Sequence, residues 1–422
     1  MAAVLSGARA ADDAAFATPW RVLLLALVYA IVAIGTDMYL PAFPAIRGAF
    51  EVSPQQVQLS LSVFLYGNAL GQLVYGPLSD RHGRRPVLLG GLAAYAAASF
   101  GCAAAADMDA FLLCRVLQGA AAAGGPVLVR ALINDRLDRV HAAHMLALLT
   151  AVMAFTAMLT PIAGGWLVGL GSWQVLFLCM GVLGLALLAC TALAVEESLP
   201  PARRLATLGA GEVLRGYLEI ARRPAFWCYV VPPALMFATV FAYVGANSFL
   251  IIEQLGVAER HHGGIYALSA GAFVAGSLTG TRLVLRVGIE RAIVSGLALG
   301  CTAAVLACGA SLLLPLSLAL VVLPAIATFF ATALVMPVAA ASAVSLFPHR
   351  AGSASAVAGF AQVSIAGLGT AAAALLVDGS TRPLHAFTLA CCVAAAVAWR
   401  AGAGIRARDP GSPRRERSAA QW

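Results

Sequence analysis

The feature that most constrains this chain is a series of apolar runs, each long enough to cross a lipid bilayer. A helix needs about 20 apolar residues to span the hydrocarbon core. The sequence predicts twelve such runs, at residues 21–42, 55–76, 86–106, 109–130, 146–168, 173–194, 225–249, 263–284, 290–311, 314–340, 352–377 and 384–402. Because 61% of the residues are apolar and 11% are charged, an ordinary soluble enzyme, a disordered chain and a secreted disulfide scaffold are excluded.

One long connection divides the chain into two halves of six runs each. We therefore expect an N-terminal tail (1–20), a six-helix bundle (21–194), a linker (195–224), a second six-helix bundle (225–403) and a basic tail (404–422). Within the linker, residues 211–220 place Val213, Leu214, Tyr217 and Leu218 on one helical face. This pattern predicts a short amphipathic helix on the membrane surface. An unstructured linker is the alternative.

The arginines indicate on which side of the membrane each connection lies. The chain has no lysine, and all but four of its 27 arginines lie in the tails, the linker and every second connection. The connections on the other side hold only Arg47, Arg260 and Arg382, and Arg115 lies within a run. Since arginine-rich connections remain cytoplasmic, both termini and the linker are predicted to be cytoplasmic.

Two charged residues are predicted to lie well inside the membrane. Asp37 is the carboxylate and Arg115 the arginine, each about six residues, or roughly 9 Å, from the outer end of its run. We expect them to pair in some conformation; the alternative is that Arg115 reaches the outer interface and Asp37 faces outer water. A buried carboxyl holds a proton more readily than one beside an arginine. A contact that changes between conformations would therefore make Asp37 a proton carrier that competes with substrate.

A charged turn follows the second run. Its defining residues are Gly76, Asp80, Arg81, Gly83, Arg84 and Arg85. Gly83 can adopt the positive φ of a tight turn, and Asp80 can pair with an arginine or cap the N-terminus of a neighbouring helix. Such a cluster could hold the two halves together at the inner rim. A plain arginine-rich loop is the alternative.

These segments resemble a known transporter family. Residues 76–86 resemble motif A of the major facilitator superfamily, and Arg115, Gln118 and Gly119 resemble its motif B. Pro161, Gly164 and Gly165 resemble its span-5 antiporter motif, although Thr156 and Thr160 replace two glycines. Residues 36–44 (TDMYLPAFP) are similar to the first-span signature of the Bcr/CflA (bicyclomycin and chloramphenicol resistance) drug-efflux subfamily.

The resemblance implies a fold, a location and roles for these residues. It implies an all-α membrane protein with twelve transmembrane helices in two six-helix bundles, acting as a monomer in the bacterial inner membrane. It assigns the charged turn to a cytoplasmic gate and ties Arg115 to proton transfer. The energy source would be the proton gradient, with no cofactor, and the partners would be protons, a small-molecule substrate and the lipid bilayer.

A broad-specificity pocket would combine aromatic and methionine surfaces with a few hydrogen-bonding groups. The candidate substrate-binding residues are Tyr39, Phe64, Asn68, Asn247, Met336 and Gln362. Helix–helix packing is the alternative role for each. We expect export of small amphipathic compounds in exchange for protons, as in multidrug efflux; export of a nucleobase, amino acid or sugar is the alternative.

Other function classes are less expected. A membrane-embedded enzyme or a sensor is disfavoured because the sequence shows no nucleophile–base set and no soluble signalling domain. The histidines, His261 and His262 among them, are predicted to lie in loops. The nine cysteines lack metal-ligand spacing. We therefore expect no metal site, and the placement of the arginines favours a membrane over a nucleic-acid partner.

Overall fold

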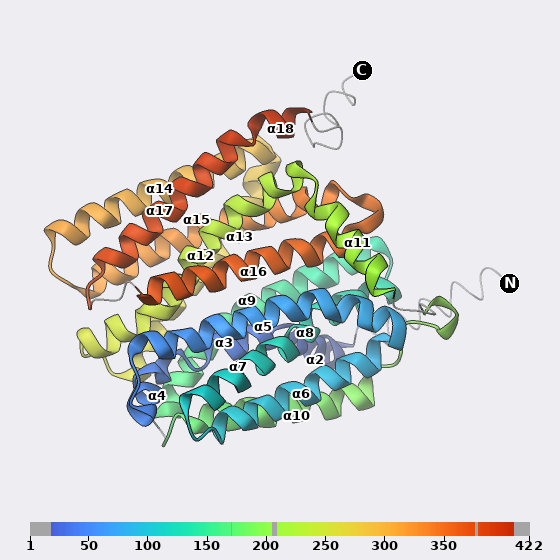
Figure 1. Cartoon of the computed structure of the whole chain (residues 1–422), viewed down its shortest axis with the longest axis horizontal. Helices are drawn as coiled ribbons and strands as arrows, with labels where there is room; N and C mark the ends of the chain where they lie inside the picture. Colours follow the sequence, from blue (N-terminus) through green and yellow to red (C-terminus); the bar gives the residue numbers. More distant parts are fainter. Residues whose placement is uncertain (1–17, 170, 205–208, 376–378, 409–422) are drawn as a thin grey trace.

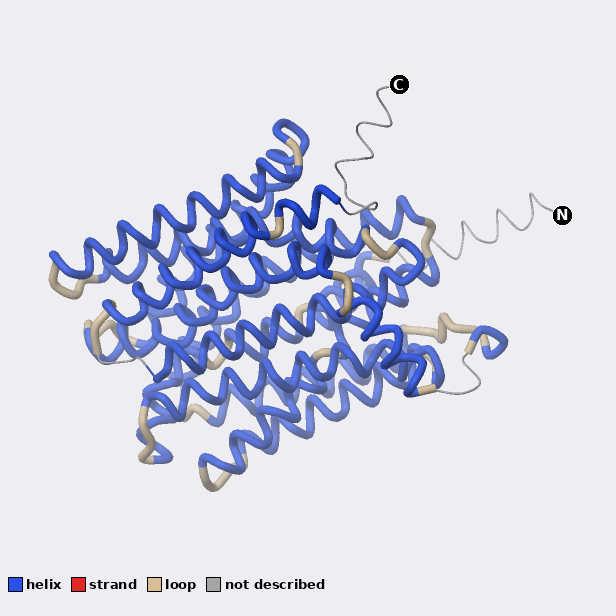
Figure 2. The backbone as a smooth tube through the Cα atoms, turned by 45° about the horizontal axis from the view of Figure 1, so that its top comes forward, coloured by secondary structure: helices blue, strands red, loops and turns tan. Residues whose placement is uncertain are grey.

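The computed structural model describes residues 18–169, 171–204, 209–375 and 379–408, which form helices joined by short loops (Figure 2). In this part of the chain, eleven helices are long and apolar enough to cross a membrane, and a bent pair at the start gives the twelfth. The predicted twelve spans are thus confirmed. The predicted N-terminal tail up to residue 17 and the basic tail from residue 409 lie outside the described residues.

The helices form one group before the linker and one group after it. The first half contains α2 (Pro19–Tyr29), α3 (Ile31–Asp37), η1 (Leu40–Ala42), α4 (Phe43–Phe50), α5 (Pro54–His82), α6 (Arg84–Ala103), α7 (Met108–Ala122), α8 (Gly124–Arg136), α9 (Arg139–Val168) and α10 (Gln174–Ala194). The linker contains η2 (Pro201–Arg203) and α11 (Ala210–Ala221). The second half contains α12 (Pro224–Ser248), η3 (Phe249–Gln254), α13 (Glu259–Val287), α14 (Ile289–Leu313), α15 (Leu318–Ser345), η4 (Pro348–Arg350), α16 (Ala351–Leu375), α17 (Arg382–Ala401) and α18 (Ala403–Arg408).

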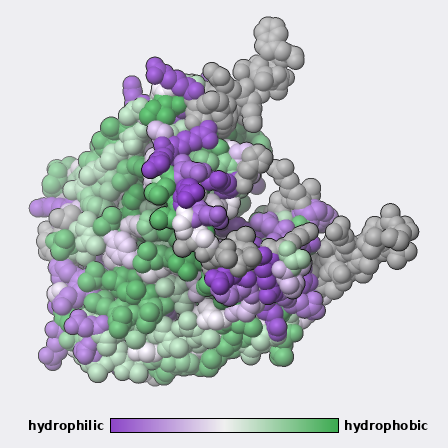
Figure 3. Space-filling view, turned by 45° about the vertical axis from the view of Figure 1, so that its right-hand side comes forward, coloured by the Kyte–Doolittle hydropathy of each residue, from purple (hydrophilic) through white to green (hydrophobic). Residues whose placement is uncertain are grey.

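The two halves lie side by side with their long helices running in the same general direction (Figure 1). Across the boundary between them, α5 packs along α16 and α9 packs along α13. The end of the molecule that carries α11 is called the linker end here, and the end that carries α4 and η3 is called the far end. Apolar side chains cover much of the outer surface between more polar ends (Figure 3), as expected of a surface that faces lipid.

The first span is broken rather than continuous. The axis bends by 47° between Pro19–Tyr29 and Ile31–Phe50. This bend lies at Ala30, between α2 and α3. Further along, η1 separates α3 from α4, and Pro41 and Pro44 have no N–H to donate there. The predicted single span at residues 21–42 is therefore made of α2, α3 and η1.

The amphipathic helix predicted in the linker is confirmed as α11, but its setting differs. Its buried side packs against the protein: Ile220 is buried, and the Tyr217 hydroxyl donates a 2.9 Å hydrogen bond to the carbonyl of Leu73 on α5. Leu214 and Leu218 are 58% and 44% exposed. The four residues predicted to share one membrane-facing side are thus divided, because α11 lies against both halves of the bundle.

Candidate functional site

Asp37 is the last residue of α3, three residues before η1. It is the only buried carboxylate among the described residues. The η1 segment packs against α12 and α13 of the other half. Burying a carboxylate without a counter-charge is costly. A buried acid at the boundary between the two halves is therefore a candidate functional group by default.

Arg115 on α7 is completely buried within the first half. Its Nη1 donates hydrogen bonds to the carbonyl of Gly35 (3.1 Å) and to Oε1 of Gln118 (2.5 Å). Its Cζ lies 4.1 Å from the ring centre of Tyr39 and 4.4 Å from that of Phe64. Desolvated cation–π contacts of this kind are worth about 2 kcal/mol. The aromatic cage thus takes the place of a carboxylate partner.

The predicted contact between Asp37 and Arg115 is not formed in this conformation, since no ion pair within 4.0 Å joins them. The two residues lie at a similar level, as expected, because Arg115 bonds Gly35, two residues before Asp37. Tyr39 faces Arg115, and residues two apart on a helical turn point in different directions. Pairing in another conformation stays a prediction.

The rest of the motif B segment holds α5 and α7 together. The amide of Gln118 donates to Ser99 Oγ at 2.8 Å, which orients the oxygen that Arg115 contacts. A Cβ at Gly119 would collide with the carbonyl of Phe64. Glycine is therefore required where the two helices cross, and this close crossing places Phe64 over Arg115.

The charged turn forms an ion-pair cluster within the first half. Arg84 bonds Asp80 at 2.5 Å and Asp135 of α8 at 3.1 Å. Gly83 has φ +98°, as the turn requires. Arg81 is exposed, and Arg85 donates to the carbonyl of Ala192 at 2.6 Å. In this conformation Asp80 does not bridge the two halves, so its predicted role as a latch between them stays a prediction for another conformation.

Sequence reasoning missed Glu197. Its carboxylate accepts hydrogen bonds from the backbone N–H groups of Arg84 (2.9 Å) and Arg85 (3.3 Å), and it pairs with Arg204 at 3.7 Å. The positive end of a helix favours a carboxylate at this position. Glu197 therefore caps α6 and ties the start of the linker to the charged turn. In the sequence, the only indication of this role is a carboxylate directly after an apolar run.

The far end of the molecule is closed by close backbone contacts between spans. A Cβ at Gly164 would collide with the carbonyl of Met38, and a Cβ at Gly263 would collide with the backbone of Pro161 and Ile162. Gly165 similarly approaches the backbone of Glu259. The antiporter-motif glycines thus lie where α9 contacts the first span and α13. An ion pair between Arg47 and Glu253 (2.6 Å) adds a bond between the halves.

Gly164→Ala should reduce the export rate at least about tenfold and lower the midpoint temperature of thermal unfolding. Alanine favours a helix by about 1 kcal/mol, but overpacking costs about 1–3 kcal/mol, and here the added methyl meets backbone. The matched control is Gly271→Ala on α13, where an added Cβ meets nothing within 4 Å. Transport rates and thermal unfolding of the two variants would test this. Equal behaviour of the two would show that the close approach is dispensable.

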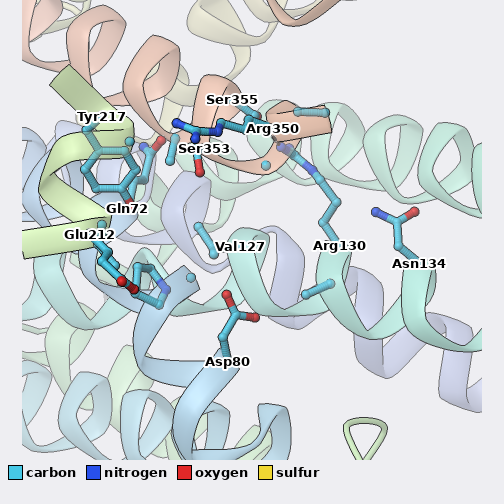
Figure 4. Close-up of a pocket in the computed structure, with 18 of the residues that line it drawn as sticks. Gln72, Asp80, Val127, Arg130, Asn134, Glu212, Tyr217, Arg350, Ser353 and Ser355 are labelled. Atoms are coloured by element: carbon cyan, nitrogen blue, oxygen red, sulfur yellow. Dashed lines mark hydrogen bonds between the residues drawn. The ribbon is translucent and has the colours of Figure 1, made fainter. Parts of the chain in front are cut away.

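A cavity of about 890 Å³ lies at the linker end, between the two halves. Its wall includes Asp80 and Arg130 from the first half, Tyr217 from α11, and Arg350 and Ser353 from the start of α16 (Figure 4). Arg130 donates to Ser355 Oγ at 3.1 Å across the cavity. Burial, and then the charge of Asp80, raises the pKa of Tyr217 to about 12. Charged and polar side chains from both halves and from the linker therefore meet on the wall of this cavity.

The candidate substrate residues do not line this cavity. Tyr39 and Phe64 instead cover Arg115. Asn68 and Asn247 are buried, and Met336 and Gln362 are half-buried. Gln72, which the sequence did not single out, lines the cavity and donates to Asn68 Oδ1 at 3.0 Å. Substrate binding by the six candidates stays a prediction.

The placement of the histidines in loops is wrong. His82 ends α5, His141 and His144 lie in α9, His261 and His262 in α13, and His385 in α17; of these, His262 and His385 are completely buried. Neither forms a nucleophile–base set with a nearby serine or cysteine and a carboxylate in the described chain. Over the same residues, no group of three or more His, Cys, Asp or Glu could hold a metal ion.

Comparison with known proteins agrees with this architecture. The family model described as "Major Facilitator Superfamily" matches residues 25–370. The chain is 30% identical over 364 residues to the multidrug resistance protein MdtL of Shigella dysenteriae, covering 85% of this chain and 89% of that protein. It is 29% identical over 269 residues to a bicyclomycin resistance protein homolog of Haemophilus influenzae, covering 64% and 67%.

Solved structures share the fold at low sequence identity. A D-xylose–proton symporter superposes with a TM-score of 0.70 at 16% identity, covering 90% of this chain and 96% of that one. A bacterial homolog of the human lysosomal transporter Spinster, in an inward-facing and occupied conformation, gives a TM-score of 0.67 at 16% identity, covering 92% and 95%.

Proposed function

Because this chain belongs to the major facilitator superfamily, we propose that it is a proton-coupled antiporter that exports small amphipathic compounds, with multidrug efflux of the Bcr/CflA type as its output. The family consists of multi-pass membrane transporters that bind small molecules and are not enzymes. Relatives named for multidrug resistance and bicyclomycin resistance support drug efflux. The proposal includes no cofactor, since the proton gradient supplies the energy.

The arrangement of the two ends supports alternating access. The distribution of arginine favours a cytoplasmic linker end. With that orientation, the polar cavity opens towards the cytoplasm, and the glycine contacts and the Arg47–Glu253 pair close the outer end. Rocking of the halves about a central site would open the outer end and close the cavity. In that movement Asp80 would approach the start of α16.

The single observation that carries the proposal is the position of Asp37. An unpaired buried carboxylate at the boundary between two moving halves is able to bind a proton in one conformation and to release it in another. Arg115 lies at the same depth in the same half, caged by aromatic rings. A conformation that brought its guanidinium to Asp37 would expel the proton, which is the step that an antiporter needs.

Inside-out membrane vesicles test the coupling directly. The protein is first expressed in a susceptible host without its own pumps, and panels of antibiotics and of metabolites identify a substrate by altered tolerance. In energised vesicles with an acidic lumen, adding that substrate should release protons from the lumen, recorded with a fluorescent pH dye. Substrate accumulation without proton movement would refute antiport. Altered tolerance to metabolites alone would refute drug efflux.

A further inference from the structure

His262 and Ser248 are buried polar side chains near the far end of the molecule, in the half that packs against the segment carrying Asp37. His262 is completely buried near the start of α13, and its Nε2 lies 3.5 Å from Ser248 Oγ at the end of α12. Its Nδ1 is buried and has no hydrogen-bond partner among the described residues. Buried polar groups without partners are rare and call for an explanation.

Tyr266 lies one turn beyond His262. It follows His262 by four residues, so both side chains lie on the same face of α13, about 6 Å apart along the axis. The segment that carries Asp37 packs close to this part of α13, because η1, which begins three residues after Asp37, contacts both α12 and α13. A Cβ at Gly164 would meet the carbonyl of Met38, and a Cβ at Gly263 would meet Pro161 and Ile162 on the same turn of α9. His262, Tyr266 and the segment around Asp37 therefore lie in one region of the molecule.

The packing around His262 belongs to the closure of the far end. Gly263, the next residue, is the one pressed against the backbone of Pro161 and Ile162. Any movement that separates α13 from α9 therefore loosens the packing next to His262 and admits water there. His261 is already exposed at the same end. The imidazole of His262 is thus buried from solvent when the far end is closed, and outer water can contact it when the far end opens.

Among the described residues, few charged or titratable groups lie near His262. They are Glu259, Arg260 and His261 of α13 itself, and Glu253 of η3, which pairs with Arg47. α12 carries Tyr243 before Ser248, α15 carries no titratable residue, and α9 carries none after His144. The first span contributes Asp37, since η1 packs against α12 and α13. Histidine is the side chain whose ordinary charge change falls between pH 5 and 8.

We propose that His262 is the residue through which protons pass between the outer solution and Asp37, with Ser248 and Tyr266 as its neighbours on the path. The inference rests on the proposed antiport. When the far end opens, the free Nδ1 accepts a proton from outer water and the other ring nitrogen gives one up towards Asp37, so the imidazole is neutral again before the end closes. His262 is a positioning and relay residue rather than a substrate ligand.

The test varies the pH on the outer side only. In inside-out vesicles the lumen corresponds to the outer solution, so lumen pH is varied from 5.5 to 8 at fixed external pH and clamped membrane potential. Substrate accumulation in the wild type should rise as the lumen is acidified. His262→Gln should require about a tenfold higher lumen proton concentration for the half-maximal rate. His261→Gln, which is exposed, and His385→Gln, which is buried in the second half, should follow the wild-type curve.

The outcomes distinguish the proposed relay through His262 from the proposed proton antiport. A wild-type rate independent of lumen pH would refute the proposed antiport itself, and the relay with it. A wild-type rate that depends on lumen pH, together with an unchanged curve for His262→Gln, would refute the relay but not the antiport.

A second experiment applies if the His262→Gln variant fails to fold. Lumenal diethyl pyrocarbonate is then applied to wild-type vesicles during transport. Modification of His262 but not of His385, mapped by mass spectrometry, would support the relay; protection of His262 throughout would overturn it.

Discussion

Asp37→Asn should reduce gradient-driven export by at least about 100-fold, the scale at which positioned proton transfer contributes to a rate. Asparagine matches the shape of aspartate and keeps a hydrogen-bonding group beside Thr36, but it cannot carry a proton. Because Asp37 is the only buried carboxylate in the described residues, no neighbouring acid can replace it. The measurement is substrate accumulation in energised inside-out vesicles.

The matched control is Asp109→Asn, which alters an exposed carboxylate in the first turn of α7 at the far end. It should export at the wild-type rate. Asp37→Asn should still exchange labelled for unlabelled substrate in the absence of a gradient, since that reaction needs binding and rocking but no proton. Full gradient-dependent accumulation in the Asp37→Asn variant would show that another residue carries the proton.

The number of spans and the position of the linker helix could be predicted because both depend on composition along the chain. A lipid core excludes polar backbone and charge, so long apolar runs become spans and arginines mark one side. The similar level of Arg115 and Asp37 could also be predicted, since rise per residue is fixed in a helix. The hydrogen bond of Arg115 to Gly35 lies at the level that this count gives.

Rotation about the helix axis could not be predicted in the same way. Depth is read along one helix, whereas the direction of a side chain is set by packing with several neighbours. Tyr39 therefore lies beside Arg115, at the position where the sequence suggested Asp37. Glu197 was missed for a related reason, because its role as a cap on α6 exists only once the linker folds back.

Small errors at span ends had large consequences for the histidines. The predicted eighth span began at residue 263, whereas α13 begins at Glu259. That difference moved His262 from an expected loop into the buried interior. Element ends are uncertain by several residues when read from sequence. Titratable residues next to a predicted span are therefore the ones whose environment the sequence defines least.

Arg115→Met should also reduce gradient-driven export by about 100-fold, but with little loss of stability. Methionine fills a similar volume among the rings of Tyr39, Phe64 and Phe177. Replacing a buried charge by an apolar side chain of similar size is often neutral or stabilising. Thermal unfolding in detergent should give a midpoint near that of the wild type, whereas Arg115→Ala should lose about 2–5 kcal/mol through the cavity that it leaves.

Arg115→Lys separates charge from shape at the same position. Lysine keeps the positive charge but lacks the planar guanidinium that lies over two rings while bonding Gly35 and Gln118. If charge alone expels the proton from Asp37, the lysine variant should retain partial coupling, about tenfold below the wild type. The control is Arg260→Met, which alters an exposed arginine at the far end. Normal gradient-driven export by the Arg115→Met variant would show that Arg115 contributes only packing. Proton exchange would then have to proceed without it.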